Sequence, residues 1–294
     1  MSHIPVAVIL ILVAVGTVLF HFISPWWWTP IASNWGYIDD TIIITFWVTG
    51  VVFVVVVLFM AYCVWRYRYR EDRRAEYEPE NTKMEVWLTV FTTVGVTAML
   101  TPGLFVWNQF VTVPEGAAEV EVVGQQWTWG YRFPGKDGKL GTSNNAKIND
   151  GNPFGVNPDD PNGRDDVLIE DTELHLPLGI PVKMLLRSKD VLHDFYVPEF
   201  RAKMDMVPGA VTYFWFTPTR PGTFDILCFE LCGVGHYQMR GNVVVEEQAD
   251  FQKWLNKQKT FEQSMAKAAP SAGDSPKPVL EAADTGSAEK GITR

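Results

Sequence analysis

Two long apolar runs, at 41–65 and 86–108, dominate the hydrophobic pattern of the first part of the chain. Neither run contains a charged residue, and each is long enough to cross a bilayer as a helix. The segment between them carries five arginines at 66–74, whereas 24–40 and 109–125 contain no lysine or arginine. Because positively charged loops remain in the cytoplasm, the pattern predicts a membrane hairpin with a cytoplasmic loop and an extracytoplasmic C-terminal part.

A third apolar stretch, at 4–23, precedes the hairpin. It is atypical of a signal peptide, because the first five residues contain no lysine or arginine and no small-x-small cleavage motif follows. An uncleaved additional helix fits the pattern, and so does an interfacial segment, since three tryptophans at 26–28 mark a membrane boundary. We therefore assign 1–30 to an additional membrane helix or a signal segment, and 31–112 to the helical hairpin.

From about residue 115 the long apolar runs give way to short alternating ones, which are typical of strands. The predicted strands lie at 119–123, 126–133, 182–187, 211–216, 223–227 and 241–246. Clusters of Pro, Gly, Asn and Asp separate them, so the pattern predicts an all-β sandwich or barrel. This extracytoplasmic domain spans 113–262 and ends in an amphipathic helix at 248–259.

Two polar segments complete the domain plan. Residues 134–173 form an insertion rich in Asp, Asn, Pro and Gly, which we expect to be a solvated loop. A calcium-binding loop is the alternative interpretation, but the spacing of the acidic residues does not match the EF-hand pattern. Residues 263–294 are rich in Ala, Ser, Pro, Lys and Glu and are predicted to form a disordered tail.

The stretch 228–239, Cys-Phe-Glu-Leu-Cys-Gly-Val-Gly-His-Tyr-Gln-Met, concentrates two thiols, an imidazole and a thioether in twelve residues. Soft sulfur ligands together with imidazole select copper over calcium or magnesium. Two cysteines four positions apart suit two thiolates that bridge a pair of copper ions. A disulfide is the simpler interpretation outside the cytoplasm, but it does not require the Gly-His-x-x-Met continuation. The third cysteine, Cys63, lies in an apolar run and is expected to be a packing residue.

A second imidazole must come from elsewhere in a chain that has only five histidines. His3 and His21 lie in or beside the N-terminal apolar stretch, and His175 is expected on the outward face of a strand. His193 stands at the end of a strand-like run, in a loop distant from the cysteines, and is the better partner. The expected ligand set is therefore His193, Cys228, Cys232, His236 and Met239, with the backbone carbonyl of Glu230 as a sixth ligand.

Three short motifs accompany the metal stretch: Asp-Val-Leu-His at 190–193, Lys-x-Asp-x-x-Pro-Gly at 203–209 and Gln-Trp-Thr-Trp-Gly-Tyr at 126–131. Together with the membrane hairpin they resemble subunit II of bacterial haem–copper cytochrome c oxidases, over about residues 35–260. The resemblance implies a cupredoxin-like β-sandwich that follows the hairpin and holds a binuclear copper centre, called Cu-A. It also implies that the chain accepts electrons from cytochrome c and passes them to a haem in subunit I, which reduces dioxygen to water and pumps protons.

The resemblance assigns a role to each candidate ligand. It implies that Cys228 and Cys232 bridge the coppers, that His193 and His236 each bind one copper, and that Met239 and the Glu230 carbonyl are weak ligands. It also places the carboxylate of Glu230 on a magnesium ion at the interface with subunit I. A hard cation that prefers oxygen ligands suits that carboxylate.

Trp127 corresponds to the tryptophan through which electrons enter the family's copper centre. The alternative is a core aromatic residue on the same strand face as Trp129 and Tyr131. Asp190 and Asp205 correspond to docking positions for cytochrome c, whose lysine-rich face attracts acidic residues. The acidic residues of the insertion would extend that surface, although such a loop is often only solvated.

Glu85 corresponds to a glutamate at the mouth of a proton channel that leads into subunit I. The sequence departs from the family here, because Trp87 follows Glu85 by two positions where the family has three. A second departure is Ala210, which stands where the family has an arginine after Pro-Gly. No Cys-x-x-Cys-His motif for a fused c-type haem occurs, so the electrons are expected from a separate donor.

The resemblance implies a multi-pass protein of the bacterial inner membrane whose copper domain lies on the periplasmic side. Its expected partners are subunits I and III, cytochrome c and membrane lipid, but no nucleic acid. The alternative function is a membrane-tethered copper-delivery protein, which usually has a thioredoxin-like fold and one anchor. Related quinol oxidase subunits lack the copper ligands, and nitrous oxide reductase needs more histidines than this chain has.

Overall fold

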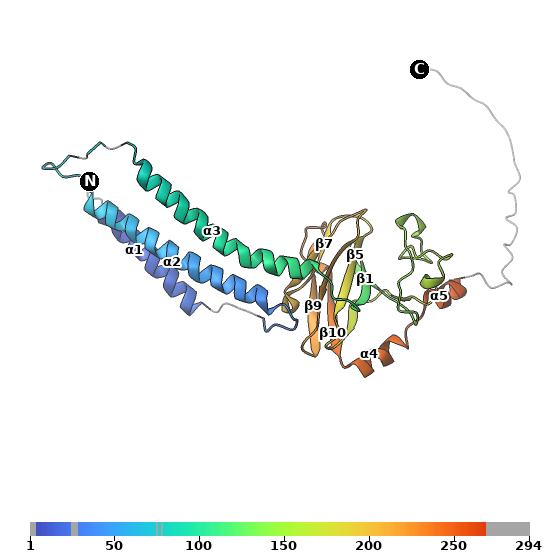
Figure 1. The fold of residues 1–294 in the computed structure, drawn as a ribbon. Coiled ribbons are helices and arrows are strands. Elements are labelled where there is room, and N and C mark those ends of the chain that lie inside the picture. Colours follow the sequence, from blue (N-terminus) through green and yellow to red (C-terminus); the bar gives the residue numbers. More distant parts are fainter. Residues whose placement is uncertain (1–3, 25–28, 75, 78, 269–294) are drawn as a thin grey trace, which may run out of the picture.

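The computed structural model of the chain describes residues 4–24, 29–74, 76–77 and 79–268. Three long helices, α1 (Ile4–Ile23), α2 (Gly36–Arg66) and α3 (Thr82–Val111), extend from one end of a β-rich domain (Figure 1). Each helix is long and apolar enough to cross a membrane. Most of their large apolar side chains are exposed in the isolated chain, as expected where lipid or neighbouring helices cover them.

The helices α2 and α3 are longer than the predicted runs at 41–65 and 86–108. Asn81 caps α3, since its side-chain oxygen accepts a hydrogen bond from the Met84 N–H at 3.1 Å. Polar residues occupy the first turns, such as Asp39 in α2. A search for apolar runs cannot detect such polar turns, so it gives helices that are too short.

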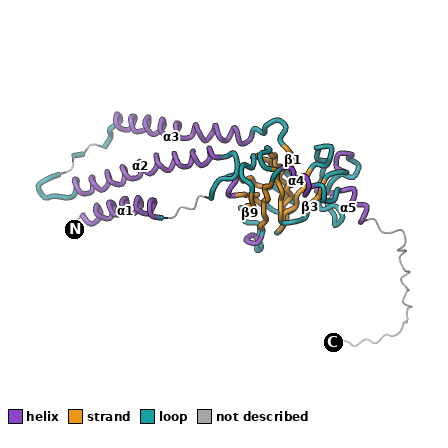
Figure 2. The backbone as a smooth tube through the Cα atoms, turned by 90° about the horizontal axis from the view of Figure 1, so that it is seen from below, coloured by secondary structure: helices purple, strands orange, loops and turns teal. Residues whose placement is uncertain are grey.

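The N-terminal apolar stretch is helical, and α1 lies alongside α2 (Figure 2). Ala7 and Ala14 are its buried residues, and their small side chains allow close approach of the two helices. The tryptophans at 26–28, which favoured an interfacial segment, lie outside the described residues.

Two five-stranded sheets pack face to face in the remainder of the chain. The first sheet has the order β3-β2-β1-β5-β8, made of β1 (Ala118–Gln125), β2 (Thr128–Phe133), β3 (Val167–Ile169), β5 (Val182–Ser188) and β8 (Thr212–Phe216). The second has the order β4-β10-β9-β6-β7, made of β4 (Glu173–Pro177), β6 (His193–Val197), β7 (Ala202–Met206), β9 (Gly222–Cys228) and β10 (Arg240–Glu246). The predicted architecture, helices followed by an all-β cupredoxin-like sandwich, is confirmed.

The predicted set of strands omits β3, β6 and β7 as separate elements, whereas β4 is the strand on which His175 was expected. β3 has only three residues, and β7 is an edge strand with the polar sequence Ala-Lys-Met-Asp-Met. Such strands form because a neighbouring strand supplies backbone hydrogen-bond partners, as β6 does for β7. Their own sequence pattern does not indicate a strand. Sheet pairing therefore adds strands that periodicity alone does not reveal.

Aromatic side chains fill the space between the two sheets. Trp129 and Tyr131 of β2 point into this core, where the Trp129 ring contacts Phe195 at 5.5 Å between centroids. Trp127 is different, because it lies in the turn between β1 and β2 and is 37% exposed. The interpretation of Trp127 as a core residue on the same strand face is therefore wrong.

The insertion at 134–173 folds against the outer face of the first sheet instead of forming a solvated loop. Its Phe154 and Val156 are buried together with Val123 of β1. As a result β1 is buried on both faces, and its outer face holds a charged residue, Glu121. The insertion was expected to be solvated because its composition is polar, yet a few apolar residues suffice to anchor it.

A buried ion-pair network joins the insertion to the first sheet. Arg187 of β5 donates from Nε to Glu121 at 2.9 Å, and the Arg132 guanidinium also bonds this carboxylate. Arg132 donates in addition to Asp166 of the insertion at 2.7 Å. Two arginines and two carboxylates are therefore paired in the protein interior, as buried charges require, although Asp166 Oδ1 has no hydrogen-bond partner among the described residues.

The C-terminal region adds two short helices, α4 (Gln248–Leu255) and α5 (Phe261–Ala268). Phe261 is buried under the insertion with Phe154, and its N–H donates to the Asp166 carbonyl at 2.7 Å. The prediction that disorder begins at 263 is therefore wrong up to residue 268, because α5 continues from this anchor. Residues 269–294, the rest of the predicted tail, lie outside the described residues.

Direct contacts connect the membrane helices to the sandwich. Arg201, which follows β6, forms an ion pair with Asp39 of α2 at 2.7 Å. Trp35 donates its indole N–H to the carbonyl of Trp215 in β8 at 2.8 Å, and Trp215 donates to the carbonyl of Gln109 in α3 at 3.0 Å. The orientation of the sandwich relative to the helices is therefore fixed by several polar contacts.

Candidate metal centre

The candidate ligands come together at one end of the second sheet. Cys228 is the last residue of β9, and the loop that follows carries Cys232, His236 and Met239 before β10 begins. His193 is the first residue of β6, which pairs directly with β9. The expectation that His193 comes from a distant loop is therefore wrong, since sheet pairing places it beside the cysteines.

The distances group the six candidate atoms into one compact cluster. The sulfurs of Cys228 and Cys232 are 3.7 Å apart. His193 Nδ1 lies 3.8 Å and the Glu230 carbonyl oxygen 3.3 Å from the Cys228 sulfur. On the other side, His236 Nδ1 lies 3.5 Å and Met239 Sδ 3.9 Å from the Cys232 sulfur. Each thiol is thus accompanied by one imidazole and one weaker donor.

This geometry fits a metal site better than a disulfide. Both cysteines are free, and their 3.7 Å separation is much longer than the roughly 2.05 Å of a disulfide bond. Metal–thiolate bonds are about 2.3 Å long, so both sulfurs can bind the same ion. His193, Cys228 and Cys232 alone already bring their ligand atoms within 4.8 Å of one another, and all three are buried. The donor set is soft, which suits copper.

The two thiols differ in acidity. Burial opposes ionisation of Cys228, but hydrogen bonds with His193 and the backbone lower its pKa to about 6. Burial raises the pKa of Cys232 to about 12, and its hydrogen bond to Cys228 and the negative charge there add to the effect. The pair therefore releases one proton readily and retains the other, because adjacent thiolates repel. A bound cation relieves that repulsion, so metal binding and loss of the second proton are coupled.

Asp190 orients His193 from the side opposite the sulfur. Its carboxylate accepts a hydrogen bond from His193 Nε2 at 2.8 Å, which leaves Nδ1 directed at Cys228. The other carboxylate oxygen accepts from the Gln126 N–H at 2.7 Å. Burial by itself would raise the pKa of Asp190, but these hydrogen bonds stabilise the carboxylate and lower the pKa below its ordinary value. Carboxylates that hold a ligand histidine in this way fix its tautomer and ring orientation, a role that the sequence did not suggest.

Trp127 lies directly over the metal loop. Its indole N–H donates to the Cys232 carbonyl at 3.3 Å, and the side-chain amide of Gln126 donates to the same oxygen at 2.8 Å. A Cβ atom at Gly235 would overlap the indole ring, and one at Gly233 would approach Gln126 to 2.9 Å. The loop therefore needs glycine at both positions. The Gly-x-Gly pattern inside the metal motif was the available sequence signal for this contact.

Three further residues were predicted to have roles outside the ligand set, namely Glu230, Asp205 and Glu85. The Glu230 carboxylate is partly exposed and has no hydrogen bond or ion pair within the part of the chain that the structure describes. Asp205 in β7 is partly buried and pairs across the strands with Asp194. Burial and the hydrogen bond with Asp205 raise the pKa of Asp194 to about 7. Glu85 is exposed in the first turn of α3, at the end of the helices remote from the sandwich (Figure 1).

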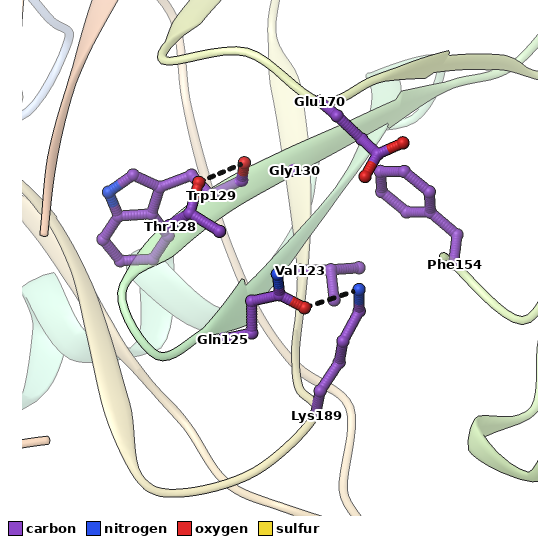
Figure 3. Close-up of a pocket in the computed structure, with 8 residues that line it drawn as sticks. All are labelled: Val123, Gln125, Thr128, Trp129, Gly130, Phe154, Glu170 and Lys189. Atoms are coloured by element: carbon purple, nitrogen blue, oxygen red, sulfur yellow. Dashed lines mark hydrogen bonds between the residues drawn. The ribbon is translucent and has the colours of Figure 1, made fainter. Parts of the chain in front are cut away.

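A separate cavity of about 210 Å³ lies beside the centre, against the first sheet. Figure 3 shows its lining residues, which are Val123, Gln125, Thr128, Trp129, Gly130, Phe154, Glu170 and Lys189. Lys189 donates to the Gln125 side chain at 2.9 Å. None of the candidate ligands lines this cavity.

The fold and the cluster define a membrane-anchored protein with a cupredoxin-like domain and a site that could hold a metal. Comparison with known proteins agrees with this class. Residues 118–247 match the family model described as cytochrome c oxidase subunit II, periplasmic domain. A protein named alternative cytochrome c oxidase subunit 2, from Bradyrhizobium diazoefficiens, is 68% identical over 256 residues, covering 87% of this chain and 92% of that relative.

Two further similarities have lower identity. The cytochrome c oxidase subunit 2 of Cereibacter sphaeroides is 28% identical over 258 residues and covers 83% of each chain. The crystal structure of the periplasmic domain of subunit II (CoxB) of Bradyrhizobium japonicum is 27% identical, with a TM-score of 0.37 over 50% of this chain and 96% of that chain. The chain belongs to the cytochrome c oxidase subunit 2 family. It is therefore a subunit of a haem–copper oxidase and assembles with the other oxidase subunits.

Proposed function

We propose that this chain carries the Cu-A centre of its oxidase, the site that accepts electrons from cytochrome c and delivers them to the haem of subunit I. The single observation that carries this proposal is the symmetry of the cluster. Two thiols 3.7 Å apart each have an imidazole within 3.8 Å. Two thiols and two imidazoles could also complete a tetrahedral site for one ion, but each sulfur here has a further donor of its own, the Glu230 carbonyl or the Met239 thioether. Six donors arranged in two sets favour a pair of ions.

The proposed ligands are Cys228 and Cys232 as bridges, His193 and His236 as one imidazole for each metal, and Met239 and the Glu230 carbonyl as weak ligands. When bound, the copper pair supplies a one-electron carrier. The protein's own contribution is rigidity, because β6 and β9 are paired within the sheet and Asp190 fixes the His193 ring. Fixed ligand positions limit structural change when the charge of a centre changes.

The proposed path for electrons enters at Trp127. Its partly exposed indole bonds the carbonyl of Cys232, so one residue links the solvent to a sulfur ligand. Leu231 and Val234 are 81% and 87% exposed around it. Exposed apolar residues of this kind are typical of an interaction surface, and we assign this rim to contact with partner proteins.

We propose that Asp190 and Asp205 contribute negative charge to cytochrome c docking. Complementary charge increases the rate of encounter and adds little to affinity. Asp190 is exposed and Asp205 is partly buried, and both carboxylates make internal contacts. Their proposed contribution to docking is therefore through the field they produce, and for Asp190 it is secondary to holding His193.

Two proposals concern the contact with subunit I. The Glu230 carboxylate is proposed to bind magnesium there, since its backbone carbonyl faces Cys228 while its side chain has no partner among the described residues. Glu85 is proposed to lie at the mouth of a proton channel, because it is exposed at one end of α3. We infer that this end lies in the cytoplasm and the sandwich in the periplasm of a bacterial inner membrane, because loops rich in arginine, such as 66–74, usually remain in the cytoplasm.

The experiment that tests the function uses the full chain, purified in detergent and loaded with copper. Bound copper per chain is measured together with visible absorption and electron paramagnetic resonance spectra. Two coppers per chain sharing one unpaired electron equally are expected. One weakly held Cu(I) without that spectrum would instead support copper delivery, and a disulfide without copper would exclude both functions.

A further inference from the structure

The loop that joins α2 to α3 is rich in arginine and aromatic residues. We refer to residues 65–74, Trp-Arg-Tyr-Arg-Tyr-Arg-Glu-Asp-Arg-Arg, as the arginine loop. It begins in the last turn of α2 and lies at the end of the helices remote from the sandwich (Figure 1). Because α2 and α3 are both candidate membrane spans, this loop lies at a membrane surface.

The guanidinium groups gather on aromatic rings rather than on carboxylates. Arg66 and Arg73 both face the ring of Tyr67, at 5.7 and 5.6 Å from its centroid. Arg68 lies 5.9 Å from the Trp65 ring and donates to the Trp65 carbonyl at 2.9 Å. Among the described residues, no carboxylate lies within ion-pair distance of any arginine of the loop. The positive charges are therefore concentrated and not neutralised.

A turn determines this arrangement. The Arg73 N–H donates to the Arg70 carbonyl at 3.3 Å, and these two residues form an isolated β-bridge. Glu71 and Asp72 occupy the tip between them and are exposed. Their carboxylates therefore stay at the tip, while two cations share one tyrosine ring. Both positive charges are held at the same ring, so an anion near that ring would be attracted by both.

We propose that the arginine loop binds the phosphate groups of anionic phospholipids. Guanidinium groups bind phosphate in a bidentate manner. Trp65, Tyr67 and Tyr69 expose half or more of their side chains, and amphipathic rings of this kind are enriched at membrane interfaces. A soluble phosphate would use the charges but not these rings. Clusters of basic residues next to a membrane helix are attracted to anionic lipid surfaces.

The test measures lipid binding by the full chain in neutral detergent. Native mass spectrometry counts bound phosphatidylglycerol and phosphatidylcholine as each lipid is added. The double variant Arg66→Gln/Arg73→Gln removes both cations from the Tyr67 ring. The control variant Arg164→Gln/Lys257→Gln removes the same charge from exposed positions of the sandwich domain. Circular dichroism and copper content verify that both variants fold.

The wild type and the control are expected to retain phosphatidylglycerol in preference to phosphatidylcholine. The Arg66→Gln/Arg73→Gln variant is expected to bind phosphatidylglycerol about thirtyfold more weakly, with phosphatidylcholine unaffected. Equal loss in the control variant would mean that only net charge matters, and unchanged binding in the loop variant would mean that the lipid binds elsewhere. Displacement of the lipid by millimolar inorganic phosphate would identify a small-anion site. Each of these three results would overturn the proposal.

Discussion

Trp127 donates its indole N–H to the backbone carbonyl of Cys232, at 3.3 Å. The amide of Gln126 binds the same oxygen at 2.8 Å, so consecutive residues of the β1–β2 turn hold one residue of the metal loop. The first sheet thereby contacts a loop of the second sheet at the metal cluster. A partly exposed aromatic ring is thus hydrogen-bonded to the backbone of Cys232, a buried cysteine that we propose as a copper ligand.

Replacement of Trp127 by Phe should separate electron uptake from copper binding. The ring would keep its apolar contact with Gly235 but lose the hydrogen bond to Cys232. Copper content and visible spectrum should be unchanged, while stopped-flow electron uptake from reduced cytochrome c should slow strongly. Trp254→Phe is the matched control, because Trp254 stacks on His175 away from the cluster. Normal uptake by Trp127→Phe would exclude the proposed path.

The variants Cys228→Ser and Cys232→Ser should each lose the two-copper centre. Serine offers a harder oxygen that does not bridge copper ions as a thiolate does. Copper analysis should find fewer than two ions per chain, and the shared-electron resonance should be absent. Cys63→Ser, in α2, is the control and should retain the full signal. A two-copper spectrum in either of the first two variants would refute the bridging role.

Asp190→Ala should weaken copper binding, because His193 loses the acceptor that fixes its ring. Removing such a partner typically lowers metal affinity about 10- to 100-fold. Competition with a copper chelator measures this change. Asp225→Ala, at an exposed position of β9, is the control. If Asp190→Ala instead keeps its copper affinity and only raises the KM for cytochrome c, the residue acts in docking alone.

Phe261→Ala should loosen the insertion from the first sheet. The buried ring packs with Phe154 and Val156, and loss of a buried phenylalanine ring costs about 3–5 kcal/mol. Chemical denaturation measures the change in free energy of unfolding. Hydrogen exchange should increase within 134–173 more than in the rest of the sandwich. Met265→Ala, which removes a partly exposed side chain of α5, should have little effect on either measurement.

The buried carboxyl group of Asp166 should make stability depend on pH. Burial raises its pKa to about 6, against the opposing effect of Arg132. The folded state therefore holds this proton more tightly than the unfolded state. The resulting stabilisation is present below about pH 4 and is lost as the pH rises through about 6.

Comparison with Asp166→Asn isolates this effect. The free energy of unfolding of the wild type relative to the variant should fall by on the order of 1–2 kcal/mol between about pH 4 and pH 6.5. Above that range the difference should be constant. If the stability of the wild type relative to the variant instead increases with pH, the ion pair with Arg132 lowers the pKa of Asp166 below its ordinary value.

The sequence by itself determined the elements whose information is local. The apolar runs identified the hairpin helices α2 and α3, and short alternating runs identified most strands of the sandwich. The spacing of Cys228, Cys232, His236 and Met239 predicts a soft donor set, because ligand chemistry depends on residue type. The helix and strand predictions were confirmed because each depends on a few neighbouring positions, and the ligand set stays a prediction.

The tertiary structure decided everything that depends on pairing between distant segments. Pairing of β6 with β9 brings His193 to Cys228, and the β1–β2 turn brings Trp127 to Cys232. The docking of the polar insertion on β1 likewise depends on Phe261, about a hundred residues further along the chain. Composition and periodicity indicate the secondary structure that one segment favours by itself. Strand register and burial, in contrast, are determined only when two segments pair or pack.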